Sequence, residues 1–134
     1  MSSDIGILLT GGTGFFGRAL LRHWIEKQKK GQFVPRVTVL TRSPEDFLSR
    51  YPELQGWAEV SFHAGDILCP ESFPKGQSFS HILHAATDST LGPKHSPLKR
   101  YIQIVDGTRN MLDYGVACGA RRFLLTSSGG VYGP

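Results

Sequence analysis

Residues 5–17, with the sequence IGILLTGGTGFFG, decide the fold. The stretch opens with a run of apolar residues, which is typical of a buried parallel strand. Glycines follow at positions 11, 12, 14 and 17, and the segment after them has helical character. Because glycine has no Cβ and tolerates positive φ, the backbone can turn sharply off the strand and approach a ligand closely. The helix that follows points its free N–H groups at an anion, so the stretch predicts a site for the diphosphate of a dinucleotide.

Two glycine spacings coincide in this turn. A G-x-G-x-x-G pattern starts at Gly12, a G-x-x-G-x-x-G pattern starts at Gly11, and both end at Gly17. An ordinary strand-to-helix turn is the alternative interpretation. The apolar strand before the motif and the amphipathic helix after it favour dinucleotide binding, because the motif requires that context. We expect the backbone amides around Thr13 and Phe15 to hold the diphosphate, with Gly17 allowing the helix to pack tightly on the strand.

Strand and helix signals alternate along the rest of the chain. Strands are predicted at residues 5–9, 36–41, 59–63, 81–85 and 122–127, and helices at about 14–29, 44–49 and 98–118. Such alternation is typical of parallel βαβ units with right-handed crossovers. It predicts an α/β protein: one domain over residues 1–134 with a Rossmann-like, doubly wound parallel sheet in the order 3-2-1-4-5, truncated after the fifth strand. Ligands of such sheets bind at the carboxyl ends of the strands.

Two of the expected helices carry apolar residues at helical spacing. In the first, the residues expected to face the sheet are Leu20, Leu21, Trp24 and Ile25. In the last, a near-continuous buried stripe is predicted at Tyr101, Ile104, Val105, Thr108, Met111 and Leu112. These patterns imply that both helices pack on the sheet through broad apolar faces.

The composition suits one globular domain, since 40% of the 134 residues are hydrophobic and 19% are charged. The formal net charge of +4 comes partly from cations near expected element ends, such as Arg121-Arg122, where they complement helix C-termini or are solvated. No nucleic-acid module accompanies this charge, so no nucleic-acid partner is expected. No apolar run approaches ~20 residues and no secretion signal is visible, which predicts a cytoplasmic protein with no membrane partner.

Cysteines and histidines give no metal-binding pattern. Cys69 and Cys118 lie in unrelated segments and are predicted to be reduced, half-buried thiols. The five histidines form no pair at helical i, i+4 spacing. We therefore predict that the chain binds no metal.

Several separate stretches together resemble one family. They are TGGTGFFG (10–17), GDI (65–67), HAA (84–86), VDGTRNML (105–112) and RFLLTSSGGVYG (122–133). In this order they resemble the N-terminal portion of the extended short-chain dehydrogenases/reductases, in particular the NAD(P)-dependent epimerase/dehydratase family that acts on nucleotide sugars. The resemblance spans nearly the whole chain and is far more specific than the glycine turn alone. It implies a nicotinamide cofactor and, for the full-length protein, a nucleotide-sugar substrate.

The resemblance also implies roles for single positions. Cofactor-binding roles fall on Gly11, Gly14, Phe16, Gly17, Asp66, Ile67, Ala85, Ala86 and Thr87. The glycines match those that bind the diphosphate, and the phenylalanine matches the apolar residue whose backbone lies beside it. The Asp-Ile pair matches residues that flank the adenine, and the Ala-Ala-Thr strand end matches the lining of the ribose and nicotinamide. Ser128 matches the catalytic serine or threonine that hydrogen-bonds the reacting oxygen, whereas Tyr132 is not the family's catalytic tyrosine.

The end of the second strand bears on the choice between NADP and NAD. An acidic residue there would bind the ribose hydroxyls of NAD. This chain has Arg42 and Ser43 instead. The arginine can pair with a 2′-phosphate through charge-assisted hydrogen bonds and the serine can add a hydroxyl, so NADP is preferred over NAD. The alternative is that Arg42 stacks on the adenine without reading the phosphate.

The chain departs from the family pattern in two ways. Ile104 stands where the family usually has asparagine, which puts that residue's polar contact in doubt. None of the four tyrosines has lysine four positions later, so the family's Tyr-x-x-x-Lys acid/base pair is absent. We therefore interpret the chain as a cofactor-binding fragment that does not turn over by itself. An uncovered sheet face and an edge strand at 122–126 would favour self-association.

Other functions remain open at this point. A reductase of small ketones or steroid-like substrates could use the same scaffold. A dinucleotide-sensing or protein-binding module without catalysis is a third hypothesis, and a degraded, empty dinucleotide site is a fourth. A Tyr-x-x-x-Lys pair in the downstream sequence of the native gene would support the enzyme, and its absence would support the sensor.

Overall fold

The structure is a computed structural model that describes residues 4–86 and 96–134. Five parallel strands form one sheet in the order β3-β2-β1-β4-β5, which confirms the predicted topology. The strands are β1 (Gly6–Thr10), β2 (Arg36–Thr41), β3 (Val60–Ala64), β4 (His81–His84) and β5 (Arg122–Leu125). The helices are α1 (Phe15–Lys29), α2 (Pro44–Arg50) and α3 (Pro97–Ala117). Short 3-10 turns lie at Pro52–Leu54, Pro70–Ser72 and Gly129–Tyr132.

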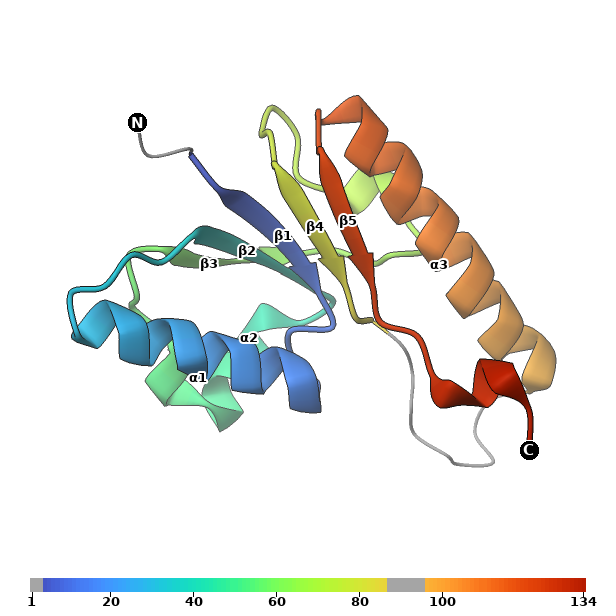
Figure 1. Ribbon diagram of the computed structural model, residues 1–134, viewed down its shortest axis with the longest axis horizontal. Coiled ribbons are helices and arrows are strands. Elements are labelled where there is room, and N and C mark those ends of the chain that lie inside the picture. Colours follow the sequence, from blue (N-terminus) through green and yellow to red (C-terminus); the bar gives the residue numbers. More distant parts are fainter. Residues whose placement is uncertain (1–3, 87–95) are drawn as a thin grey trace.

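Helices cover both faces of the sheet (Figure 1). Helices α1 and α2 lie on one face, where Leu21, Ile25 and Phe47 pack against Leu9 and Val39 of the central strands. Helix α3 lies on the other face, where a second cluster forms around the residues Leu8, Leu40, Ile67, Phe73, Phe79, Ile82 and Met111. Successive residues of a strand point to opposite faces, so β1 sends Leu8 to one cluster and Leu9 to the other. Its central position explains why β1 is buried along its whole length.

The predicted buried stripe of α3 is only partly right. Met111 is fully buried, but Tyr101, Ile104 and Leu112 are 63%, 45% and 46% exposed. The face that α3 presents to the sheet is instead narrow and glycine-rich, with Gly107, Met111 and Gly115 as its buried residues. A Cβ added to Gly107 would lie 2.6 Å from Ile67 Cδ1, and one added to Gly115 would lie 2.9 Å from Ile82 Cδ1. Because α3 approaches the sheet through these glycines, its large apolar residues on other faces point away from the sheet.

The element ends agree with the predictions to within a few residues. Strand β2 has its predicted bounds, whereas β5 ends two residues earlier than expected. Gly31 after α1 and Gly119 after α3 have φ of 67° and 80°, which is the left-handed conformation that ends helices. Cys118 is half-buried as predicted, but Cys69 is exposed because it lies on a surface turn. Within the described ranges, no helix is both long and apolar enough to span a bilayer.

Candidate functional site

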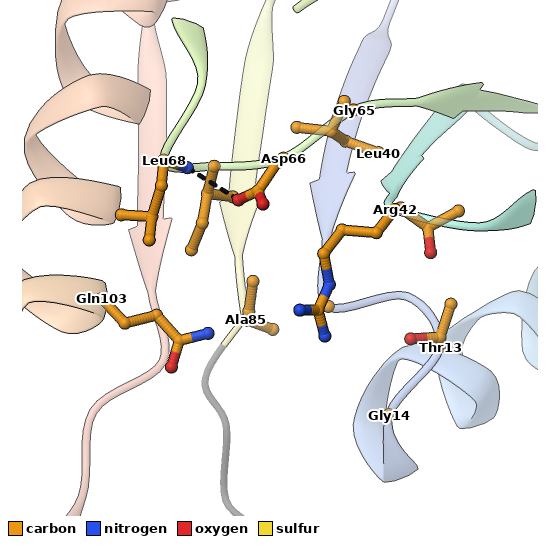
Figure 2. Close-up of a pocket in the computed structure, with 13 residues that line it drawn as sticks. Thr13, Gly14, Leu40, Arg42, Gly65, Asp66, Leu68, Ala85 and Gln103 are labelled. Carbon is orange, nitrogen blue, oxygen red and sulfur yellow. Dashed lines mark hydrogen bonds between the residues drawn. The ribbon is translucent and has the colours of Figure 1, made fainter. Parts of the chain in front are cut away.

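A pocket lies at the carboxyl ends of β1, β2 and β4 (Figure 2). The strand order reverses at this point, since β2 and β3 lie on one side of β1 and β4 and β5 lie on the other. Its lining consists of Gly11, Thr13, Gly14, Leu40, Thr41, Arg42, Gly65, Asp66, Ile67, Leu68, Ala85, Ala86 and Gln103. Ligands of open parallel sheets bind at this kind of position. Seven of the residues predicted from the sequence therefore come together here: Gly11, Gly14, Arg42, Asp66, Ile67, Ala85 and Ala86.

The glycine turn forms one wall of the pocket. Gly11 has φ of 73°, and the N–H of Gly14 donates to the carbonyl of Gly11 at 3.0 Å. A Cβ on Gly11 would lie 2.4 Å from the carbonyl carbon of Ala85, so β1 and β4 nearly touch where the turn begins. Gly14 is the N-cap residue of α1, has no side chain to cap the helix, and is followed by no acidic residue in the first turn. The positive end of α1 is therefore suited to an anion.

Three of the predicted residues belong to α1 but do not line the pocket. Gly17 packs against the turn, because a Cβ there would lie 2.3 Å from Gly12 Cα. The side chains of Phe15 and Phe16 are 75% and 70% exposed and meet edge to face with ring centroids 5.3 Å apart. Any role of these phenylalanines in holding a diphosphate therefore belongs to their backbone.

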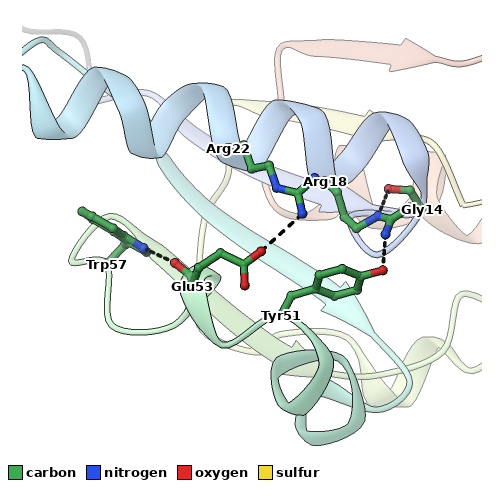
Figure 3. Close-up of polar contacts among 6 residues, drawn as sticks. All are labelled: Gly14, Arg18, Arg22, Tyr51, Glu53 and Trp57. Atoms are coloured by element: carbon green, nitrogen blue, oxygen red, sulfur yellow. Dashed lines mark hydrogen bonds and ion pairs between the residues drawn. The ribbon is translucent and has the colours of Figure 1, made fainter.

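A polar cluster links the start of α1 to the segment after α2 (Figure 3). Arg18 Nε donates to the Gly14 carbonyl at 3.3 Å, and its Nη1 donates to the Tyr51 hydroxyl. The same guanidinium lies over the Tyr51 ring, 4.8 Å from its centroid. One turn later, Arg22 pairs with Glu53 at 3.2 Å. These contacts hold the glycine turn and the start of α1 against the segment after α2.

Arg42 extends from the end of β2 into the pocket. Figure 2 shows its guanidinium between Ala85 and Thr13, close to the glycine turn. Ser43, the other residue predicted to meet a 2′-phosphate, is the N-cap residue of α2 and does not line the pocket. Among the described residues of the lining, Asp66 is the only one with a carboxylate, and it comes from the segment after β3. The end of β2 therefore presents a cation and no acid to a bound ribose.

The turn at residues 65–72 holds Asp66 and Ile67 in place. One carboxylate oxygen of Asp66 accepts the N–H of Leu68 at 2.9 Å, and the hydroxyl of Ser72 accepts the N–H of Asp66 at 2.9 Å. From α3, the Asn110 amide donates to the Ile67 carbonyl at 2.9 Å. Contacts within the turn and with α3, which packs on the same face of the sheet, thus fix this rim of the pocket.

Beneath the pocket, β1 and β4 are joined by buried polar side chains. Thr10 Oγ1 lies 2.6 Å from His84 Nδ1 and accepts the N–H of Ala86 at 3.2 Å. The hydroxyl and the N–H of Thr126 both donate to the His84 carbonyl, which ties β5 to the same point. Burial lowers the pKa of His84, because a charged imidazole would lose its hydration there.

Sequence reasoning did not assign roles to several lining residues, namely Leu40, Thr41, Gly65, Leu68 and Gln103. Most of them adjoin a predicted residue at a strand end. Gln103 is different, because it reaches the pocket from α3 (Figure 2). It lies four residues before Gly107, which α3 buries, so helical spacing could have placed it toward the sheet.

Two predicted residues remain. Thr87 is outside the described residues. Ser128 follows β5, is exposed and does not line this pocket, and its carbonyl accepts the N–H of Val131 at 3.2 Å. Tyr114 does not substitute for a missing acid/base, because it donates to the Pro74 carbonyl at 2.8 Å and burial raises its pKa to about 12. Across residues 4–86 and 96–134, no three His, Cys, Asp or Glu side chains are grouped to hold a metal.

Comparison with known proteins gives a consistent result. The model of the NAD dependent epimerase/dehydratase family matches residues 7–134. A UDP-glucose 4-epimerase from Erwinia amylovora is 28% identical over 96% of this chain and 38% of its own length. A 3 beta-hydroxysteroid dehydrogenase type 7 from Mus musculus is 31% identical over 95% of this chain and 33% of its own length. This chain therefore spans about a third of the length of these relatives.

Solved structures agree with the observed topology. A yeast methylglyoxal/isovaleraldehyde reductase, solved in complex with NADPH, superposes with a TM-score of 0.71 at 18% identity. The match covers 92% of this chain and 37% of the reductase. At so low an identity the likeness concerns the fold, which in both proteins is the doubly wound parallel sheet described above.

Proposed function

The chain belongs to the NAD-dependent epimerase/dehydratase family, and on this premise we propose that it forms the dinucleotide-binding part of a nucleotide-sugar epimerase or dehydratase. The observation that carries the proposal is the pocket at the carboxyl ends of β1, β2 and β4. Its residues suit a nicotinamide dinucleotide, since the glycine turn presents backbone without side chains to the pocket at Gly11 and Gly14.

Within this proposal, each rim of the pocket binds one part of the dinucleotide. The turn at Gly11–Gly14 and the start of α1 hold the diphosphate through backbone N–H groups. Asp66 accepts a hydrogen bond from the adenine amino group and Ile67 packs on the ring. Ala85 and Ala86 lie where the chain must leave room for the ribose beside the nicotinamide. The residues Gly11, Gly14, Asp66, Ile67, Ala85 and Ala86 line the same pocket as Arg42.

The bound nicotinamide would supply hydride chemistry, accepting a hydride from a sugar carbon and returning it. Ser128 would hydrogen-bond the reacting oxygen of the sugar. This chain has no Tyr-x-x-x-Lys pair, so we expect binding of the dinucleotide without turnover. A steady-state assay of the purified chain with UDP-sugars tests this expectation, and turnover above background would contradict it.

The preference for NADP over NAD is part of the proposal. It is supported by the guanidinium of Arg42 in the pocket and by the lack of an acidic residue at positions 41–43. Calorimetric titration of both dinucleotides into wild type, Arg42→Ala and Arg36→Ala tests it. Loss of a charge-assisted contact should weaken NADP binding about 10- to 100-fold in Arg42→Ala while NAD binding changes little.

Arg36 provides the matched control for this titration, because it is an exposed arginine at the other end of the same strand. Arg36→Ala should leave both affinities unchanged. If Arg42→Ala lowers the two affinities by the same factor, Arg42 stacks on the adenine or supports the pocket without reading the 2′-phosphate. If wild type binds neither dinucleotide at millimolar concentration, the proposed function is wrong.

A reductase of small ketones or steroids is the second candidate. It is favoured by the similarity to the mouse 3 beta-hydroxysteroid dehydrogenase, whose identity to this chain exceeds that of the bacterial epimerase. A non-catalytic dinucleotide sensor remains the third. Full-length protein from the native gene, assayed with UDP-sugars and with 3 beta-hydroxysteroids, separates all three, because the sensor would bind dinucleotide and turn over neither substrate.

A further inference from the structure

The buried pair of Thr10 and His84 lies directly under the pocket. Thr10 is fully buried and His84 is 2% exposed. Their Oγ1 and Nδ1 atoms are 2.6 Å apart, a short distance for a side-chain hydrogen bond. Through Thr10 this pair reaches the N–H of Ala86, which lines the pocket. Two hydrogen bonds therefore connect the His84 ring to backbone that would face a ligand.

The direction of each hydrogen bond follows from the chemistry of the groups. The N–H of Ala86 can only donate, so Thr10 Oγ1 accepts it. The threonine hydroxyl has one proton, and within the described part of the chain His84 Nδ1 is the acceptor in contact with it. Nδ1 must then be unprotonated, and the ring is neutral with its proton on Nε2. A proton on Nδ1 would leave the buried hydroxyl proton without an acceptor, which is unfavourable.

The surroundings of His84 also disfavour a charge. Strand β1 contributes the neutral Thr10, and β5 contributes the Phe123 ring, whose centroid is 6.1 Å away. The charged residues Asp106 and Arg109 of α3 pair with each other at 3.7 Å, with both side chains about half exposed or more. Burial alone lowers the pKa of His84, and no charged group in the described ranges contributes to that shift.

A displacement of Thr10 would also displace the backbone of Ala85 and Ala86, which lines the pocket. The amide of Ala85 donates to the Thr10 carbonyl at 3.1 Å, which is the last ladder bond between β1 and β4. One residue further on, Gly11 is so close to Ala85 that it has no space for a Cβ. For the next amide, that of Ala86, the Thr10 hydroxyl is the acceptor in place of a backbone carbonyl, because β1 has already turned away toward α1.

We propose that His84 is a positioning residue whose neutral ring holds Thr10 and Ala86 in the geometry that binds a dinucleotide, so that protonation of the ring weakens binding. The inference rests on the proposed function. It adds to that function a titratable group that does not touch the ligand but sets its affinity.

Calorimetric titration of NAD at pH 7.5 and pH 5.5 tests this inference. NAD is the suitable probe, because its diphosphate does not change charge over this range, whereas the 2′-phosphate of NADP does. Wild type should bind more weakly at pH 5.5, by at most about tenfold, because the lowered pKa leaves only part of the rings protonated and each protonated ring loses one buried hydrogen bond of this kind. His84→Asn should bind equally at both pH values, because its carboxamide oxygen replaces Nδ1 as an acceptor and cannot be protonated. His84→Leu should bind weakly at both.

His81→Asn is the matched control. His81 lies at the other end of β4, partly buried and bonded to the hydroxyl of Ser80 at 2.8 Å. Its substitution should leave the pH dependence as in wild type. Circular dichroism at pH 5.5 establishes that each variant is folded, and nitrogen-15 NMR of the imidazoles at pH 7.5 should show the Nε2–H tautomer for His84.

Each alternative outcome has a defined meaning. A pH dependence that persists in His84→Asn overturns the inference and points to another titratable group. A flat wild-type profile, an Nδ1–H tautomer, wild-type affinity in His84→Leu, or loss of the wild-type fold at pH 5.5 also overturns it. These results leave the proposed function intact. Failure of wild type to bind any dinucleotide at pH 7.5 refutes the proposed function and this inference with it.

Discussion

The two ends of the sheet differ in how completely the helices cover them. Around β1 and β2, under α1 and α2, the residues Leu21, Ile25, Phe47 and Leu54 are at most 5% exposed. At the α3–β5 end, Val116 of α3 is 84% exposed and Leu124 of the edge strand is 58% exposed. Leu124 lies opposite Leu83, so it points to the same face of the sheet as α1, at a position that the described helices leave exposed. The α1–α2 side is closed by residues of this chain, whereas the α3–β5 side is open and presents apolar side chains to its surroundings, as is typical of a surface that another surface covers.

The sharpest test of the closed side is the pair Gly17→Ala and Gly14→Ala. A Cβ on Gly17 would lie 2.3 Å from Gly12 Cα, where only backbone could move, so we expect a loss of about 3 kcal/mol or more in the free energy of unfolding. A Cβ on Gly14 would meet its nearest atom at 3.4 Å. Gly14→Ala should cost below ~1 kcal/mol, the penalty of alanine at an N-cap. Urea unfolding followed by circular dichroism measures both, and equal losses would contradict the tight packing at Gly17.

The next largest effect compares leucines on the two sides. Leu21 is fully buried under α1, so Leu21→Ala should lower the free energy of unfolding by about 2–5 kcal/mol. Leu124→Ala, on the exposed edge strand, should change it by less than ~0.5 kcal/mol. Urea unfolding at low protein concentration is the measurement. A large loss for Leu124→Ala would mean that β5 is covered in solution.

Self-association gives a third test of the same contrast. We expect wild type to associate through the open side, and Leu124→Lys to weaken that association about tenfold. Phe33→Lys is the control, because Phe33 is 62% exposed in the connection between α1 and β2. Sedimentation velocity over a range of concentrations measures the association. Wild type that stays monomeric at all concentrations would contradict the expected association through the α3–β5 side.

The smallest expected effect is the dependence of stability on pH. Burial lowers the pKa of His84 from its ordinary value of 6.5, so the unfolded chain binds this proton more readily than the native one. The contribution of His84 to stability is therefore complete above about pH 6.5 and is lost as the pH falls through the lowered pKa. Urea unfolding at pH 7.5 and 5.5 should show a smaller loss for His84→Asn than for wild type. Identical losses would mean that other groups cause the acid sensitivity.

The sequence predicts the closed side of the molecule far better than the open side. The order of the strands and the glycine turn follow from patterns that are local in the chain, such as the apolar run before Gly11. Among the predicted pocket residues, Arg42 follows from its place after a strand, whereas Asp66, Ile67, Ala85 and Ala86 follow from the family resemblance. Helix α3 was harder, because its apolar spacing suggested a broad buried face while Gly107 and Gly115 make the real contact. The spacing shows which residues of a helix are apolar. It does not show whether the same chain provides the surface that would bury them.

The pocket shows the same limit. Arg42 was found because it follows a strand, and Asp66 because of the family resemblance. Gln103 reaches the pocket from a helix, and its position depends on how α3 crosses the sheet. The Thr10–His84 pair joins residues 74 apart in the chain, so no local pattern could have indicated it. Contacts of this kind become visible only when the sheet is assembled.

The central place of β1 also has a kinetic consequence. It pairs with β2 on one side, about thirty residues later in the chain, and with β4 on the other, where Ile7 lies opposite His81. During synthesis the ribosome releases β1, β2 and β3 well before β4. One edge of β1, the most apolar strand, therefore stays unpaired until β4 has emerged. Chains dominated by such distant pairings fold slowly. The interval before β4 emerges is the period in which nascent chains would be most prone to aggregate and most in need of a chaperone.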